Sequence, residues 1–230
     1  MKMKSKLSNM IVPSHDYYKR TEVSNSDLTT LKNLLHPHIM YGDREAIFRF
    51  GSLVDAMITE PLHVNHYSRT ISSDSIPYSE DEWQHAEEMR KALYDEALHD
   101  SFLAKVLSTA DTQTAMVNTA QQLEYGQFPF TLPTRCKWDW WLSYCGFGGD
   151  LKTTFASTQK EFDEAIDFFD WDRSRAWYMD IAGSNRDFIY GISKKNNRVF
   201  KHYIQRGDET YNRGRAKYEE LAFQYWCLSL

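Results

Sequence analysis

The sequence predicts a mixed α/β (α+β) fold, in which a central sheet is flanked by helices and preceded by a helical N-terminal region. Two observations support this class. Hydrophobic residues recur at helical spacing through roughly the first 110 residues, whereas β-branched and aromatic residues alternate with polar ones beyond them. Helical spacing then returns between and after the later strand-like segments, so strands and helices are interleaved.

The N-terminal part carries the signals of three amphipathic helices. Leucines at helical spacing follow the polar residues 24–27, which offer several N-caps. A second helix is predicted over 44–59. A third opens at the capping box of 79–82 and continues, with one break near Asp100, to about Leu107.

The remainder predicts an α/β core. Three strands joined by short turns indicate an antiparallel meander, and a helix pair, two strands and a closing helix follow it. The predicted ranges are 114–125, 128–141, 147–154, 161–169, 173–182, 187–193, 199–205 and 208–227. We expect residues 1–230 to form a single domain, with 1–110 as its helical part and 111–230 as its core.

Composition limits the class of protein. The chain has 230 residues, 42% of them hydrophobic, and no apolar run long enough to cross a membrane. Its basic N-terminus, residues 1–6, has no apolar stretch after it, which favours a cytoplasmic location. Three cysteines without CxxC spacing indicate free thiols in a reducing compartment. The net charge of −5 disfavours broad non-specific nucleic-acid binding, but a metal-dependent nuclease remains compatible with it.

One short segment carries the strongest chemical signal. Side chains alternate across a strand, so Asp150 and Lys152 should share a face. If this strand pairs with the preceding one, Asp139 lies beside Asp150, and the two carboxylates with the Leu151 carbonyl would suit Mg²⁺ or Mn²⁺. Glu124, on the strand before, is a candidate further carboxylate.

The same spacing also occurs by chance on solvated strand edges. Two flanking features favour a site. The pair Gly148-Gly149 permits close backbone approach, and Thr153 and Thr154 can donate to a phosphate.

A cluster of tryptophans allows a different interpretation. Trp138, Trp140 and Trp141 could stack on bases or sugars, as in a carbohydrate-binding module. Trp138 and Trp140 are expected to share a face of their strand, which favours packing in the core.

These motifs together resemble the PD-(D/E)XK nuclease superfamily, in particular the phage and prophage exonucleases similar to RecE (exodeoxyribonuclease VIII). The resemblance extends from Ser24 to the C-terminal helix. It is carried by Ser24-x-Ser26-x-Leu28, Phe50-Gly51-Ser52-Leu53-Val54-Asp55 with Glu60-Pro61, Arg135-x-Lys137-x-Asp139, Asp150-Leu151-Lys152-Thr153-Thr154, and 171–178. Asp55 stands where the family usually has a histidine ligand, and Arg175 stands where it has a glutamine.

The resemblance implies a restriction-endonuclease-like sheet and a Mg²⁺-dependent exonuclease that degrades linear duplex DNA from the 5′ end. It implies that Asp139, Asp150 and Asp55 bind metal and that Lys152 positions the attacking water. Residues matched to the family's DNA contacts are Ser26, Arg135, Thr153, Arg175 and Tyr178. The implied partners are DNA, a single-strand annealing protein and further copies of the chain. The Asp55 and Arg175 departures leave open an inactive nuclease-fold protein that binds DNA or a recombination partner.

Overall fold

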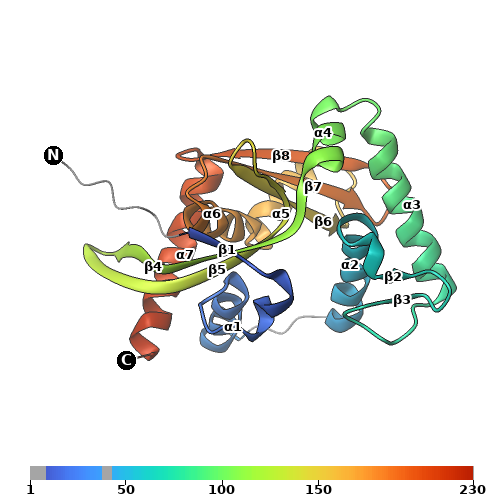
Figure 1. Ribbon diagram of the computed structural model, residues 1–230. Helices are drawn as coiled ribbons and strands as arrows, with labels where there is room; N and C mark the ends of the chain where they lie inside the picture. The colour runs from blue at the N-terminus through green and yellow to red at the C-terminus, as the bar shows by residue number, and fades with distance from the viewer. Residues whose placement is uncertain (1–8, 38–42, 230) are drawn as a thin grey trace.

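The computed structural model of the chain describes residues 9–37 and 43–229 (Figure 1). These residues form a 6-stranded mixed sheet with helices on both faces, so the predicted α/β class is confirmed. The basic segment 1–6, on which the expectation of a cytoplasmic location rests, lies outside the described residues.

The predicted helices occur in the predicted order along the chain, and two short 3-10 helices, η1 and η2, were not predicted. They are η1 (Ser14–Lys19), α1 (Asn25–Leu35), α2 (Arg44–Thr59), η2 (Pro61–His63), α3 (Glu80–Glu96), α4 (Ser101–Thr109), α5 (Gln159–Phe168), α6 (Trp171–Ala182) and α7 (Glu209–Leu228). Within the described ranges, none of these helices combines the length and the apolar character that crossing a membrane requires.

The strands form one large sheet and one small sheet. Their bounds are β1 (Asn9–Val12), β2 (Val64–Asn65), β3 (Thr70–Ile71), β4 (Asp111–Tyr125), β5 (Phe128–Leu142), β6 (Phe147–Thr154), β7 (Arg186–Ser193) and β8 (Val199–Gln205). The large sheet has the order β1-β4-β5-β6-β7-β8, and β2 pairs only with β3.

The meander of β4, β5 and β6 is antiparallel, as predicted. The chain then crosses over through α5 and α6, and β7 joins β6 in parallel. β8 returns antiparallel beside β7, and β1 adds an antiparallel strand to the far edge at β4. The sequence did not predict β1, β2 or β3, because strands of two to four residues are too short to show a period.

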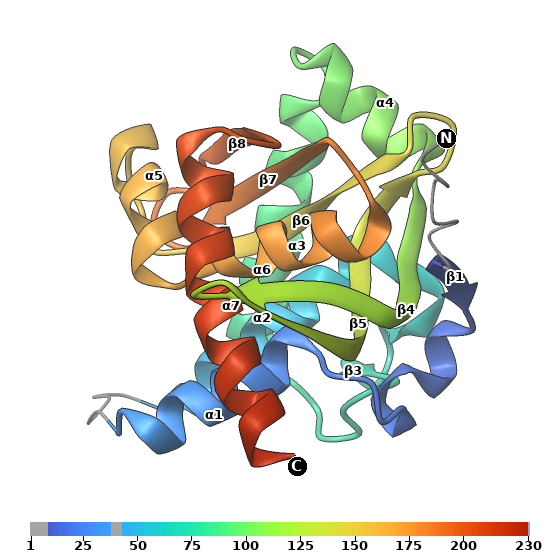
Figure 2. The ribbon, with the colours of Figure 1, turned by 90° about the vertical axis from the view of Figure 1, so that its left-hand side faces the viewer.

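The two faces of the sheet carry separate hydrophobic cores. Helices α1, α5, α6 and α7 cover one face, and α2, α3 and α4 cover the other (Figure 2). Trp177 of α6 is buried in the first core, and Met89 of α3 in the second. Residues on β6 and β7 alternate between these cores, so the centre of the sheet is buried on both sides.

Side-chain caps fix where the N-terminal helices begin. Ser24 and Asp27 form a reciprocal capping box at α1, and Ser79 and Glu82 form the predicted one at α3. The Asp100 carboxylate accepts hydrogen bonds from two backbone N–H groups of the next turn. Asp100 therefore starts a new helix, α4, and this explains the break predicted there.

The glycine pair at the start of β6 makes room for aromatic rings. A Cβ on Gly148 would overlap the ring of Trp138, and a Cβ on Gly149 would overlap the ring of Phe188. The close approach predicted for this pair is therefore an approach to side chains of the two cores.

Trp138 and Trp140 are both buried, as predicted, but the expectation that they share a face is wrong. Trp138 packs against Tyr178 of α6, whereas Trp140 packs against Phe188 in the opposite core. The ladder between β4 and β5 is interrupted between them at Gln113, which has a left-handed φ of 51°. At this break the register is unchanged, yet Trp138 and Trp140 on its two sides enter opposite cores.

Candidate active site

The candidate site lies where β5 and β6 separate. The two strands pair from their shared turn as far as Trp140 and Gly149, and the ladder ends there. Asp139 of β5 and Asp150 of β6 would form the next residue pair if the ladder continued. In the gap, the Asp139 carboxylate accepts a hydrogen bond of 2.8 Å from the backbone N–H of Leu151. The two carboxylates are thus neighbours, as strand alternation predicts.

The backbone of Leu151 also faces this gap. Its N–H points toward β5, and the N–H and C=O of a strand residue point to the same side. The Leu151 carbonyl is therefore directed toward the same space as the Asp139 carboxylate, as the predicted metal site requires. Its side chain is buried in the core beneath α2 and α3.

Two cations flank Asp150. Lys152, two residues along β6, forms a short ion pair with its Oδ2 atom, and Arg175 of α6 places Nη1 3.4 Å from its Oδ1 atom. The Asp150 side chain is 7% exposed and that of Lys152 is 29% exposed. Lys152 is therefore the member of this group that reaches solvent.

Asp55 enters from α2 on the opposite side. Its Oδ2 atom accepts a hydrogen bond of 3.2 Å from Gln113, and its Oδ1 atom accepts one of 3.3 Å from Thr59. Gln113 also donates to the Thr59 hydroxyl at 2.8 Å, which closes the triangle. No sequence pattern singles out Gln113 or Thr59, because their role depends on how α2 packs against β4.

The charged side chains of the site shift one another's pKa values. Burial raises the pKa of Asp55 to about 6, against the attraction of Lys152. Burial, and then repulsion by Asp55 and Asp150, hold the pKa of Asp139 well above its usual range. Burial also opposes ionisation of Asp150, but Arg175 and Lys152 outweigh it and lower its pKa. The proton of Lys152 is retained, because attraction by Asp150 and Asp139 outweighs burial and raises its pKa.

Arg175 does not occupy a DNA-facing position, so its predicted contact with DNA is wrong. Its side chain is 1% exposed and lies between Asp150 and Asp187, with Nη1 3.8 Å from Asp187 Oδ1. Its guanidinium lies 4.1 Å from the ring centre of Tyr178. Asp187 was missed by sequence reasoning, although a carboxylate directly before the apolar residues 188–190 of β7 is a usable signal.

Arg135 is also buried rather than available to DNA, and the prediction for it is wrong. Its Nη1 atom donates to the backbone carbonyls of Tyr17 at 2.7 Å and Arg20 at 2.5 Å. Its Nη2 atom lies 3.4 Å from Asp27 at the start of α1. Arg135 therefore ties the N-terminal segment to β5.

We expect Arg135→Ala to lower the free energy of unfolding by about 2 kcal/mol, because two buried carbonyls lose a charged donor. Affinity for duplex DNA should stay within about twofold of native, which is below the loss expected for a phosphate contact. Chemical denaturation and a DNA-binding titration measure the two quantities. Arg90→Ala on the exposed side of α3 is the control, and should change stability by less than about 0.5 kcal/mol. Loss of DNA affinity without loss of stability would show that Arg135 contacts DNA after all.

Glu124 does not join the carboxylate group. It is exposed and pairs with Pro129 near the tip of the β4–β5 hairpin, some ten residues along the strand from Asp139's position. At about 3.3 Å per residue, this places it roughly 30 Å away. The prediction that Glu124 joins the metal site is wrong, because β4 is long and Glu124 lies at the end far from Asp139.

The other residues matched to DNA contacts lie apart from one another. Ser26 is exposed in the first turn of α1, and Thr153 is half-buried on β6 near Gly51 of α2. Tyr178 is half-buried against Trp138. A role for Ser26, Thr153 or Tyr178 in DNA binding stays a prediction.

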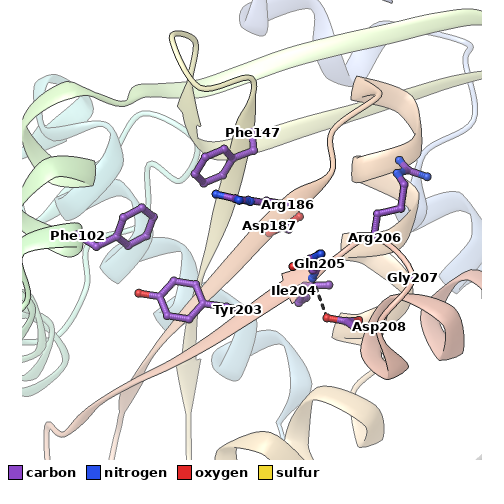
Figure 3. A pocket seen from close by; sticks show the side chains of 10 residues that line it. All are labelled: Phe102, Phe147, Arg186, Asp187, Tyr203, Ile204, Gln205, Arg206, Gly207 and Asp208. Carbon is purple, nitrogen blue, oxygen red and sulfur yellow. Dashed lines mark hydrogen bonds between the residues drawn. The ribbon is translucent and has the colours of Figure 1, made fainter.

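A hollow of about 890 Å³ opens elsewhere, at the first residues of β7 and the end of β8 (Figure 3). Figure 3 shows the rings of Phe102, Phe147 and Tyr203 facing this space from three different elements. Asp187 is the one residue that it shares with the charged group above. Because Asp55, Asp139, Asp150 and Lys152 do not line it, we place the candidate site at the strand separation.

The donors at the strand separation suit a hard divalent cation. Three carboxylates and a carbonyl offer only oxygen, which Mg²⁺ and Mn²⁺ prefer. Within residues 9–37 and 43–229, no three acidic, histidine or cysteine side chains, as they now stand, form a group that could hold a metal ion. Asp150 is turned to Lys152 and Arg175 instead, so a bound ion would take the oxygen that the flexible Lys152 now contacts.

Comparisons with known proteins add only distant structural similarity. No protein-family model matches the chain, and no curated protein is significantly similar to it. A phage-related exonuclease from Haemophilus somnus 129PT is 13% identical, with 91% of this chain and 96% of that one covered, at a TM-score of 0.36. The structure of SSO0001 is 10% identical, with 86% and 84% covered, at a TM-score of 0.35. Similarity at this level supports no conclusion about function, so the proposal below rests on the site.

Proposed function

We propose that this protein is a metal-dependent nuclease, specifically a Mg²⁺- or Mn²⁺-dependent exonuclease that hydrolyses linear duplex DNA from the 5′ end. The observation that carries the proposal is the meeting of Asp55, Asp139, Asp150 and Lys152 where β5 and β6 separate. These residues come from three elements and include every metal-binding side chain implied by the motif resemblance.

Each residue has a role in this proposal. The bound divalent ion would supply Lewis-acid charge to the scissile phosphate. Asp139 and Asp150, with Asp55 from α2 and the Leu151 carbonyl, are the residues that would bind it. Lys152 reaches solvent beside them, where its ammonium can hold the attacking water and offset charge developing on the phosphate.

The departure at Asp55 is compatible with catalysis. Its carboxylate is fixed by Gln113 and Thr59 and supplies an oxygen donor, which a hard cation accepts as readily as an imidazole. The departure at Arg175 leaves the Asp150 and Lys152 pair intact. We therefore favour an active enzyme over the inactive DNA-binding alternative.

Burial removes the observation that motivated the carbohydrate-binding alternative. Trp138, Trp140 and Trp141 are 0%, 1% and 7% exposed, so none of them offers a ring face to a sugar.

The motif resemblance also supports a finer proposal. It assigns the protein to phage-type DNA recombination in the cytoplasm, as a homo-oligomer that cooperates with a single-strand annealing protein. Preference for the 5′ end and for duplex DNA belongs to this finer proposal.

Digestion of an end-labelled linear duplex tests the function. With Mg²⁺ the native protein should shorten the DNA, and EDTA should abolish this, because three carboxylates without the ion repel the phosphate. Lys152→Ala should lower the rate at least about a hundredfold while the protein still binds Mn²⁺. Labels at the 5′ and 3′ ends, followed by gel electrophoresis, report the polarity.

Two controls accompany this assay. Lys160→Ala removes an exposed lysine of α5 and should retain the native rate. A closed circular duplex should resist the native protein, because it has no ends. Equal residual cleavage by native protein and Lys152→Ala would indicate a contaminating nuclease and reject the proposal.

A further inference from the structure

Arg175 is a cation that cannot leave the site. Its side chain is 1% exposed, and its guanidinium is packed against the rings of Tyr178 and Trp138 at 4.1 and 5.2 Å from their centres. Its Nη1 atom lies 3.4 Å from Asp150 and 3.8 Å from Asp187. None of its nitrogens makes a hydrogen bond, so charge and packing alone fix its position.

The two neighbours of Asp150 differ in mobility. Lys152, 29% exposed on a flexible stem, can turn into solvent and release the Oδ2 atom to a metal ion. Arg175 is enclosed and keeps its position beside the Oδ1 atom. One oxygen of Asp150 is therefore available to a metal, and the side toward α6 is closed to a second ion.

The position of this guanidinium disfavours a second ion. Arg175 already faces both Asp150 and Asp187, so a second divalent ion beside Asp150 would place a further positive charge next to a buried cation. That repulsion is costly at low dielectric.

We propose that Arg175 is a built-in cation in place of a second metal ion, and that the site binds one divalent ion. Asp187 is a positioning residue, because its carboxylate faces the same Nη1 atom of the guanidinium that faces Asp150. This inference rests on the proposed function, since it concerns the same metal site.

Titration of Mn²⁺ into the full chain by isothermal calorimetry tests the inference without any measurement of cleavage. The native protein should bind one ion. Arg175→Gln removes a positive charge and should tighten binding at least about tenfold, whereas Asp187→Asn removes a negative charge and should weaken it by a similar factor. The double variant restores the balance and should bind within about threefold of native.

Arg173→Gln is the matched control. Arg173 lies two residues away on α6, is 3% exposed, and pairs with Asp170 rather than with Asp150. Its loss should leave the affinity for Mn²⁺ unchanged. Circular dichroism shows whether Arg175→Gln is folded. If it is not, the inference is tested by two other affinities: Asp187→Asn should bind Mn²⁺ more weakly than native, and the double variant should regain the native affinity.

The outcomes separate this inference from the proposed function. Native protein that binds no Mn²⁺ would overturn the metal site itself. Native protein that binds two ions, or weaker binding by every folded variant, including the double variant, would overturn the role of Arg175 and leave the metal site standing. Opposite shifts in the two single variants support the inference, because a general loss of structure would lower both affinities.

Discussion

Asp150→Asn is expected to lower DNA cleavage at least about a thousandfold and to abolish measurable Mn²⁺ binding. Asp150 contacts both Lys152 and Arg175, and it also faces the gap that Asp139 fills. A neutral amide offers the metal a weaker oxygen and leaves the two cations without their shared partner. Cleavage of end-labelled duplex and calorimetric titration measure the two losses.

A matched control tests whether the loss of any carboxylate charge is enough to lower cleavage. Glu164 is an exposed carboxylate on α5 that faces Lys160 at 3.8 Å, so Glu164→Gln removes the same charge at a solvated ion pair. This variant should cleave DNA at the native rate. Cleavage by folded Asp150→Asn at the native rate would remove Asp150 from the mechanism. Circular dichroism checks that the variant is folded.

Gly214→Ala is expected to lower the free energy of unfolding by about 3 kcal/mol, or the melting temperature by roughly 10 °C. Gly214 is buried on α7 where that helix crosses α6. A Cβ there would overlap the backbone carbonyl of Asp172 and contact the backbone nitrogen of Arg173. Backbone atoms cannot rotate away as a side chain can, so the two helices would have to separate.

Gly51→Ala tests the same substitution where space is available. Gly51 is also inside a helix, α2, but its Cβ would meet only the Thr153 hydroxyl at an ordinary 3.5 Å. This variant should gain about 0.5 to 1 kcal/mol, because alanine loses less backbone entropy than glycine in a helix. Thermal unfolding of both variants is the measurement. A loss of stability by Gly51→Ala equal to that of Gly214→Ala would show that helix crossing is not the cause.

Much of the fold follows from local pattern. The capping boxes at Ser24 and Ser79 and the meander of long strands were predictable, because each is encoded by residues within one or two turns or one hairpin. The neighbouring positions of Asp139 and Asp150 were predictable for the same reason, since a short turn fixes the register of two adjacent strands.

The two arginines that local pattern misplaced both depend on long-range packing. Arg135 was expected at a DNA surface, but η1 and the segment after it cover it. Arg175 was expected to contact phosphate, but the docking of α6 on the sheet buries the guanidinium beside Asp150 of β6 and Asp187 of β7. Neither burial can be inferred from the few residues around each arginine.

The sequence by itself determined the α/β class, the starts of α1, α2 and α3, and the pairing of Asp139 with Asp150 and Lys152, because periodicity, caps and hairpin register act over a few residues. Only the tertiary structure decided that Asp55, Gln113 and Thr59 meet across α2 and β4, and that Arg175 lies enclosed beside Asp187. These contacts join residues distant in sequence, and they form only when helices dock on both faces of the sheet and exclude water from the charges between them.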